Sequence, residues 1–363
     1  MPSTRTLLQA LLLGVGSCAA NPLVASNSGP EVETRTLEEI HQAALKEGGI
    51  VTLWHGGDET TQQNTLKQAF EARFPGMTLN STVDLSKYHD AALDEQLANN
   101  NVYVDSIILQ TVQDYPRWNE EGALLQYAPL GFNEVAPAYK DSLGATYYGV
   151  AINGWKFIVN TNKSNVALNE WEDFLNPELK DKLVLTYPND DDAVLWAFDL
   201  ILERYGTGFF DRLLAQNPRW VRGTATPSTI LRQANSTYAA TFTSGGGFVS
   251  SNGVNFTLPT QGPFVTWAQT AAILKDAPHP EGAKLLHGFL LSTEWQQPRG
   301  WSVRRDVPLP ANFPFGELDD NKNTNAGAFM PFMVDRARVG RLKDWLESKI
   351  GTPQGLSPLK DGI

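Results

Sequence analysis

The sequence predicts an α/β protein of two lobes, each a mainly parallel sheet flanked by helices, with two extended hinge segments that cross between the lobes. Its 363 residues are 42% hydrophobic, which suffices for two domains at roughly 100–200 residues per domain. Short apolar runs alternate with helical stretches along most of the chain. This alternation indicates parallel sheets that helices cover on both faces.

The first lobe is predicted to begin with a helix at 37–46, which Gly48-Gly49 ends. Strands and helices then alternate regularly. The expected strands are 50–54, 77–83 and 102–109, and the expected helices are 59–74, 88–98 and 114–121.

A change of lobe is predicted at 147–160, a β-rich run with no helix inside it. A second extended run, 254–259, is predicted to return the chain to the first lobe. Between them we expect strands at 183–187 and 238–242 and helices at 191–205, 206–216 and 228–234. Helices at 280–291, 294–300 and 326–350 follow. Two lobes joined in this way place a ligand cleft at the carboxyl ends of their strands.

These elements set the expected domain boundaries. The first lobe is 36–150 and 257–300, the second is 151–256, and 301–363 is a C-terminal helical segment that packs across both lobes.

The first 35 residues are predicted to lie outside the folded lobes. Residues 1–20 have the layout of a signal peptide, with Arg5, an apolar stretch and small residues before a cut after Ala20. Residues 21–35 are polar and predicted to be a disordered lead-in. Cys18 has two interpretations, a lipid-attachment cysteine in the lipobox-like VGSC or a small residue near the cleavage site.

Charge and cysteine content restrict the partners. The net charge of −11 argues against nucleic acid, whose phosphates need a basic face. No segment after the signal peptide approaches 18 continuous apolar residues, so no membrane span is expected. With one cysteine at most in the mature chain, disulfides and cysteine-based metal sites are excluded. We expect a secreted or periplasmic monomer that needs no cofactor.

Four N-x-Ser/Thr sequons are present, at Asn80, Asn162, Asn235 and Asn255. A single sequon arises easily by chance. Four in an exported chain favour a eukaryotic, glycosylated protein.

Loops after the predicted strands of the first lobe supply candidate ligand-binding residues. His55, Gly57 and Asp58 stand between a strand and a helix, where glycine lets the backbone approach a ligand and free N–H groups attract anions. The alternatives are a helix cap for Asp58 and a hydrogen-bonded structural role for His55.

Two further loops of this lobe follow the same logic. Lys87 and His89 come after the second strand, at the expected cleft rim, although a helix cap by Ser86 with a solvated face explains them equally. Gln110 and Thr111 come after the third strand, where amide and hydroxyl groups would orient a polar ligand.

The second lobe contributes an acidic and a glycine-rich loop. Asn189, Asp190 and Asp191 open a helix, where acids cap the helix or bind a cation. The loop with Thr243, Ser244 and Gly245 is either a flexible connector or a cradle for a carboxylate or phosphate.

Two tryptophans, Trp155 and Trp267, lie in or next to extended segments. Aromatic rings in a cleft stack on a ligand ring or cation, whereas in a core they only fill space. Both interpretations stay open.

Four segments resemble the bacterial ferric-iron, thiamine and polyamine binding proteins that feed ABC importers. They are 38–59, 104–127, 147–162 and 261–297, and the last contains ILKDAPHPEGAKLL. The resemblance implies the type II periplasmic-binding fold, with 38–59 as the opening helix, first strand and first ligand loop and 147–162 as hinge strands.

The resemblance also locates two departures. The ferric-iron branch has adjacent tyrosines before the second crossing, where this chain reads YAATFTS (238–244). The polyamine branch holds its ammonium ligand with an aromatic residue and an acid two positions on. Trp267 matches the aromatic residue, and Gln269 stands in place of the acid.

The function predicted is capture of a small polar ligand by hinge closure, with an ABC importer permease as partner. The ligand stays open among an organic cation or zwitterion, a phosphorylated solute and ferric iron. One alternative is a secreted binding or effector protein without a transporter. Another is an enzyme on the same fold, but the chain lacks G-x-S-x-G, H-E-x-x-H and phosphate-loop motifs, and we expect no enzyme.

Overall fold

The computed structural model describes residues 29–245 and 253–361. The predicted signal peptide with Cys18 and the start of the lead-in lie outside these residues. From Gly29 the lead-in is ordered, so the prediction of disorder there is wrong. Strand β1 (Glu31–Val32) pairs in parallel with β5 (Tyr127–Ala128). Glu33 is buried because its carboxylate accepts hydrogen bonds from the Tyr127 hydroxyl at 2.7 Å and from Arg35.

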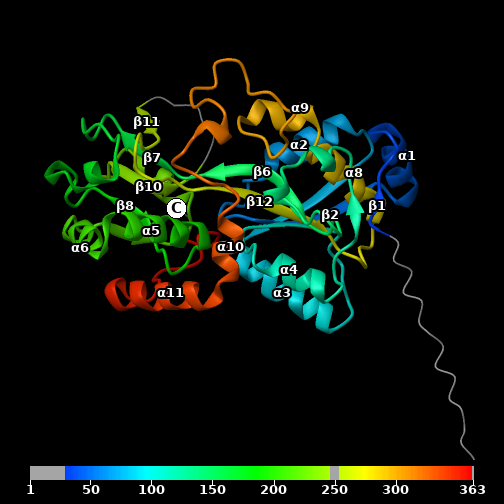
Figure 1. The fold of residues 1–363 in the computed structure, drawn as a ribbon, viewed down its shortest axis with the longest axis horizontal. Coiled ribbons are helices and arrows are strands. Elements are labelled where there is room, and N and C mark those ends of the chain that lie inside the picture. Colours follow the sequence, from blue (N-terminus) through cyan, green and yellow to red (C-terminus); the bar gives the residue numbers. More distant parts are fainter. Residues whose placement is uncertain (1–28, 246–252, 362–363) are drawn as a thin grey trace, which may run out of the picture.

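Five strands form the sheet of the first lobe in the order β3-β2-β4-β12-β6. Strands β2, β12 and β6 of this sheet are labelled in Figure 1. The bounds of the five strands are β2 (Ile50–Gly56), β3 (Thr78–Asp84), β4 (Ser106–Leu109), β6 (Tyr148–Gly154) and β12 (Thr266–Ile273). Strands β2, β3 and β4 pair in parallel, and β12 is antiparallel to both β4 and β6. Four of these strands therefore share one direction, and β12 opposes them, as expected for a mainly parallel sheet.

Helices surround this sheet. They are α1 (Leu37–Glu47), α2 (Asn64–Arg73), α3 (Ser86–Ala98), α4 (Asp114–Glu120), α8 (Pro280–Leu290) and α9 (Thr293–Gln296). Two hydrophobic clusters fill the space between helices and sheet.

The second lobe repeats this plan with two short sheets joined edge to edge. Its strands are β7 (Lys156–Asn160), β8 (Val184–Thr186), β9 (Arg219–Val221), β10 (Ala240–Ser244) and β11 (Val254–Thr257). Strand β8 is parallel to β9, and β7 is antiparallel to β10 and β11. A parallel bridge from Leu183 to Ala240 joins the two sheets. The Thr186 N–H completes the junction by donating to Thr243 Oγ1 at 2.8 Å.

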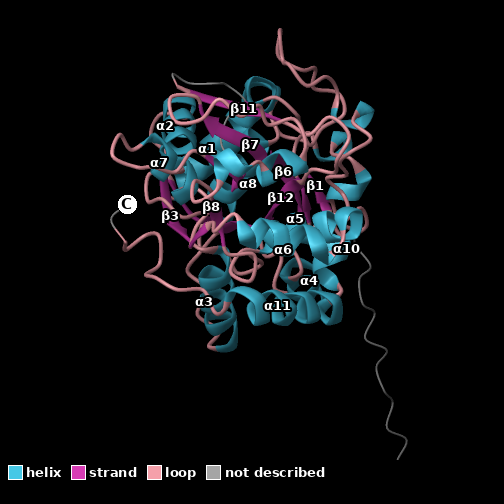
Figure 2. Cartoon of the chain, turned by 90° about the vertical axis from the view of Figure 1, so that its left-hand side faces the viewer, coloured by secondary structure: helices cyan, strands magenta, loops and turns pink. Residues whose placement is uncertain are grey.

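Helices α5 (Asp192–Tyr205), α6 (Thr207–Ala215) and α7 (Thr226–Arg232) cover the second lobe. The C-terminal helices α10 (Phe329–Val334) and α11 (Arg336–Ile350) also belong here. Helix α11 lies beside α5 and α6 (Figures 1 and 2), with the rings of Phe210 and Trp345 5.3 Å apart.

The first crossing lies where it was predicted. Strand β6 of the first lobe continues through Trp155 into β7 of the second. The prediction that 254–259 forms the return crossing is wrong. Residues 254–257 form β11, which pairs with β7 inside the second lobe, and β12 makes the return by pairing with β6. An extended run alone does not reveal which sheet edge it joins, since pairing is a tertiary choice.

Most predicted elements differ from the observed ones by one to three residues at an end, and three differ more strongly. The helix expected from residue 59 begins at Asn64, because Gln62 Oε1 accepts hydrogen bonds from the N–H groups of Asp58 and Glu59 and holds a turn there. The strand expected from residue 102 begins at Ser106. The helix expected over 326–350 divides at Asp335, whose carboxylate caps α11 by accepting from the Arg338 N–H at 3.0 Å.

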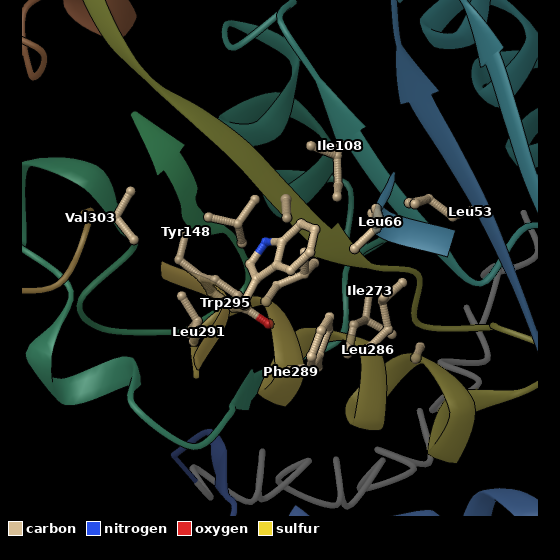
Figure 3. Packing of buried hydrophobic residues seen from close by; sticks show 14 of the residues in the cluster. Leu53, Leu66, Ile108, Tyr148, Ile273, Leu286, Phe289, Leu291, Trp295 and Val303 are labelled. Atoms are coloured by element: carbon tan, nitrogen blue, oxygen red, sulfur yellow. The ribbon is translucent and has the colours of Figure 1, made fainter. Parts of the chain in front are cut away.

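Helix α8 lies directly on the first-lobe sheet. Figure 3 shows Leu286 and Phe289 of this helix near Ile273 and Tyr148 of the sheet strands. The approach is close at Gly282, where a Cβ atom would lie 2.5 Å from the Ile50 carbonyl oxygen of β2. A glycine is therefore required at this position, since backbone cannot yield to a side chain.

We predict that Gly282→Ala lowers the free energy of unfolding by about 1–3 kcal/mol through overpacking. Gly340→Ala in α11 is the matched control, since a Cβ there meets nothing within 4 Å. That control is expected to raise stability by about 0.5–1 kcal/mol, because alanine is the better helix former. Urea denaturation of both variants measures the difference, and equal shifts would contradict the close packing of α8.

Candidate ligand-binding cavity

A cavity of about 1010 Å³ lies between the two lobes. Its lining includes the ends of β2 and β4 in the first lobe, the crossing strands β6 and β12, and loops at the starts of α5 and α7 in the second. The carboxyl ends of the parallel strands thus open into it, which is the usual ligand position in such sheets. The volume suits an organic solute.

Nearly all residues predicted to bind ligand line this one cavity. Those that do are His55, Gly57, Asp58, Lys87, Gln110, Thr111, Trp155, Asn189, Asp190, Asp191, Ser244, Gly245, Trp267 and Gln269. Whether they contact a ligand stays a prediction.

His89 and Thr243 do not line the cavity. His89 is buried and stacks on Trp54 with ring centroids 4.8 Å apart. Thr243 is fully buried, where its hydroxyl joins β10 to β8. Both side chains point into the protein interior. The sequence places these residues near the end of a strand or the start of a helix, but it does not show in which direction their side chains point.

His55 is held as a neutral imidazole. Its Nδ1 lies 2.7 Å from the Gly56 carbonyl oxygen, so Nδ1 carries the proton and donates, while Nε2 keeps a lone pair. Burial is the main reason that its pKa is lowered to about 4, and the Arg299 charge contributes to the shift. At neutral pH this residue can accept a hydrogen bond.

Asp58 contacts the opposite lobe. Its Oδ2 accepts hydrogen bonds from the backbone N–H groups of Thr224 and Ala225, the latter at 2.7 Å. The facing residue is Gly223, with φ of +78°, where a Cβ would lie 2.7 Å from Asp58 Oδ2. Burial raises the pKa of Asp58, although the two N–H groups oppose that shift. The Asp58 carboxylate of the first lobe is therefore hydrogen-bonded to the backbone of the second lobe.

Asp190 is also engaged across the cleft. Its carboxylate forms ion pairs with Lys87 of the first lobe and with Arg222, whose Nε lies 2.8 Å away. Arg222 Nη2 in turn donates to the Tyr88 hydroxyl of the first lobe at 3.1 Å. Burial opposes ionisation of Asp190, but the hydrogen bonds from Arg222 and Lys87 outweigh it and lower the pKa.

Asp191 and Asp192 serve helix α5. The Asp191 carboxylate caps the helix by accepting from the Val194 N–H at 2.9 Å, and Asp192 pairs with Lys343 at 3.0 Å. Burial raises the pKa of Asp191 to about 7 despite the cap.

Aromatic and amide groups of the crossing strands form one wall. The rings of Trp155 and Trp267 lie 4.8 Å apart, tilted by 58°. Gln269 Oε1 accepts hydrogen bonds from Trp267 Nε1 at 2.9 Å and from Asn153 Nδ2 at 3.3 Å. Thr111 Oγ1 and Trp155 Nε1 are buried without a hydrogen-bond partner in the described chain.

The glycine-rich loop approaches this wall. The Ser244 hydroxyl donates to the Thr224 carbonyl at 2.6 Å and lies 2.7 Å from Ser228 Oγ. A Cβ at Gly245 would lie 3.2 Å from Trp155 Cζ3. Residues 246–252, with the other two glycines of this loop, lie outside the described residues.

Arginines are the functional candidates that sequence reasoning missed. Arg232, Arg299 and Arg336 line the cavity. They lie on helices or loops with no ligand-loop pattern around them, so nothing in the sequence singled them out.

The described residues contain no group of three or more His, Cys, Asp or Glu side chains that could hold a metal ion. None of their helices is long and apolar enough to cross a membrane.

Residues 115–299 match the sequence model of the family of bacterial extracellular solute-binding proteins. The chain belongs to this family. Its members bind solutes rather than catalyse reactions, and they work with ABC permeases. A comparison with curated proteins found no match.

Similar solved structures support the fold of this solute-binding protein. Iron-bound HitA from Pseudomonas aeruginosa is 16% identical with a TM-score of 0.62, covering 82% of this chain and 99% of HitA. AfuA from Actinobacillus pleuropneumoniae, with fructose-6-phosphate bound, is 17% identical with a TM-score of 0.64, covering 84% and 99%. The spermidine/putrescine protein PotD from Streptococcus pneumoniae is 14% identical with a TM-score of 0.57, covering 84% and 99%. The predicted two-lobed, type II periplasmic-binding fold is confirmed.

We predict a pH-dependent effect of Asp191→Asn, which keeps a capping oxygen but cannot ionise. The folded state holds the Asp191 proton up to about pH 7, while the unfolded chain releases it near 3.8. The stability contributed by this group is therefore present below about pH 4 and lost as the pH rises to 7. The variant should be more stable than wild type by about 1–3 kcal/mol at pH 8 and equal to it near pH 4.

Urea denaturation from pH 4 to 8 measures this effect. Asp344→Asn, at an exposed position of α11, is the control and should differ little from wild type at every pH. A constant difference between Asp191→Asn and wild type would show that burial does not perturb the carboxyl.

Proposed function

We propose that this solute-binding protein captures a small polar solute in the interlobe cavity by closing its lobes about the crossing strands. The observation that carries the proposal is the set of direct bonds across the cleft. Asp58 binds the N–H groups of Thr224 and Ala225, and Lys87 pairs with Asp190. Such bonds form only when the lobes approach each other, so they are the contacts of a closed state.

These cross-cleft residues, which we call the latch, are Asp58, Lys87 and Tyr88 of the first lobe with Asp190, Arg222, Thr224 and Ala225 of the second. The latch assigns a role other than ligand contact to three residues that the sequence nominated, Asp58, Lys87 and Asp190. Ligand contact falls instead to residues of the cavity whose polar groups are not committed within the chain.

The cavity supports an organic solute more than a bare metal ion. Its volume of about 1010 Å³ far exceeds one ion. The described residues also lack a His, Cys, Asp and Glu cluster that could hold a metal. Among the similar structures, AfuA carries a sugar phosphate, which shows that this fold accommodates a ligand of that size.

Export and glycosylation extend the proposal. The family is extracellular, in keeping with a signal peptide and with delivery of the solute to an ABC permease. All four sequon asparagines, Asn80, Asn162, Asn235 and Asn255, are exposed and none lines the cavity. Glycans at these positions would leave ligand entry open.

Capture is tested by the thermal stability of the mature protein with a panel of hexose phosphates, hydroxycarboxylates, neutral hexoses, thiamine and polyamines. A ligand present at 100 times its Kd stabilises by about 2.7 kcal/mol, a readily measured rise in melting midpoint. Absence of any shift across such a panel, together with no ligand in native mass spectra, would overturn the capture proposal.

The latch is tested by small-angle scattering of the ligand-free protein. Asp58→Ala removes the acceptor for two N–H groups, so the lobes should separate and the radius of gyration should rise. Asp141→Ala is the matched control, because that carboxylate also accepts from N–H groups, those of Leu143 and Gly144, but within the first lobe. An unchanged radius for Asp58→Ala, or an equal change in both variants, would contradict the latch.

A further inference from the structure

The C-terminal tail, residues 351–361, lies against loops of the second lobe that border the cavity. It follows helix α11 and contains no helix or strand. Gly351 has φ of +78° and turns the chain away from the helix axis. The Gly351 carbonyl oxygen accepts a hydrogen bond at 3.1 Å from Asn189 Nδ2, and Asn189 lines the cavity. The start of the tail is therefore anchored to the loop before α5.

A turn near the end of the tail presents the ring of Pro358. The Lys360 N–H donates to the Ser357 carbonyl oxygen at 2.8 Å, which closes a β-turn over 357–360. Pro358 is the second residue of this turn, where proline is favoured because its ring presets the φ angle that the turn requires. The ring is therefore held in place at a low cost in conformational entropy.

Pro358 packs beside Gly223, the residue that precedes the two N–H donors of the latch. A Cβ atom at Gly223 would lie 2.7 Å from Pro358 Cγ and 2.7 Å from Asp58 Oδ2. The tail and the Asp58 carboxylate therefore both lie against this glycine. A side chain at Gly223 would collide with the two of them together.

The loop 223–225 has to be held in one conformation to receive Asp58. Two successive N–H groups, those of Thr224 and Ala225, must point at the same carboxylate oxygen. Gly223 has φ of +78°, and a glycine can leave this conformation for many others. The Pro358 ring occupies space beside Gly223 and so excludes some of these alternatives.

The two anchoring contacts of the tail, at Asn189 and Gly223, both belong to the second lobe. Asn189 precedes α5, and Gly223 precedes α7. The tail therefore travels with the second lobe when the lobes move. It can influence closure through the loop that receives Asp58.

We infer that residues 351–361 form a strap that positions the second-lobe half of the latch, with Pro358 as the positioning residue. The inference rests on the proposed latch and adds the element that sets how readily it closes. The strap restricts the loop 223–225 while the lobes are open, so its N–H groups are already aligned when Asp58 arrives. Loss of the strap shifts the protein toward open lobes.

The test is hydrogen exchange of the ligand-free mature protein, measured by mass spectrometry on peptides that contain Thr224 and Ala225. Pro358→Ala removes the ring that packs beside Gly223. It should speed exchange of these two amides about 3- to 10-fold, the equivalent of one or two partly buried methylene groups.

A truncated chain provides a second variant. Removal of residues 352–363 keeps the Gly351 anchor and should speed exchange of the same amides at least as much as Pro358→Ala. Peptides that contain Leu143 and Gly144 serve as an internal reference, because their N–H groups donate to Asp141 within the first lobe. Exchange of these reference peptides should stay at the wild-type rate.

Pro353→Ala is the matched control. Like Pro358, Pro353 is half-buried and lies in the strap. Both substitutions give the unfolded chain the same added freedom, so they should lower the melting midpoint alike. Only Pro358→Ala should speed exchange at Thr224 and Ala225, and equal exchange in the two variants would overturn the positioning role of Pro358.

Asp58→Ala separates failure of the strap from failure of the latch. It should speed exchange at Thr224 and Ala225 about 10- to 100-fold, because hydrogen bonds to a charged group are lost. If it does so while Pro358→Ala and the truncation change nothing, the strap is overturned and the latch stands. If Asp58→Ala leaves exchange unchanged, the latch is overturned and the strap with it.

Discussion

The antiparallel pairing of β6 with β12 is the constraint on which the cavity depends. Strand β6 leads out of the first lobe, and β12 returns to it. Their pairing, from Thr266–Gly154 to Ala271–Tyr148, holds the two lobes together at one side of the cavity. Helix α10 adds a third connection there, since Phe329 lies 6.0 Å from the Trp267 ring. Movement of one lobe relative to the other must therefore occur by bending at these segments. The wall formed by Trp155 and Trp267 lies at this hinge and keeps its place. Ligand recognition there would require little rearrangement, whereas the latch loops have to travel.

The structure with the latch formed has both favourable and unfavourable contributions. Closure gives the latch its hydrogen bonds and ion pairs, each worth about 1–3 kcal/mol when charge-assisted. Asp58 Oδ1, Thr111 Oγ1 and Trp155 Nε1 are buried without partners in the described chain, and each such atom costs about 1–3 kcal/mol. A ligand that gives these atoms partners in the closed form would shift the population toward it.

The sequence predicted the residues at strand ends that line the cavity, but not the contacts between the two lobes. His55, Gln110 and Asp190 could be placed because parallel strands bring their carboxyl ends to one edge, a local rule. The partner of Asp58 could not be foreseen, since Thr224 and Ala225 lie 166 and 167 positions away. Arg299 was missed because no local sequence pattern marks it as a residue of the cavity. Strand β11 shows the same limit for the fold. The sequence pattern predicted an extended segment, but only its pairing with β7 places it in the second lobe.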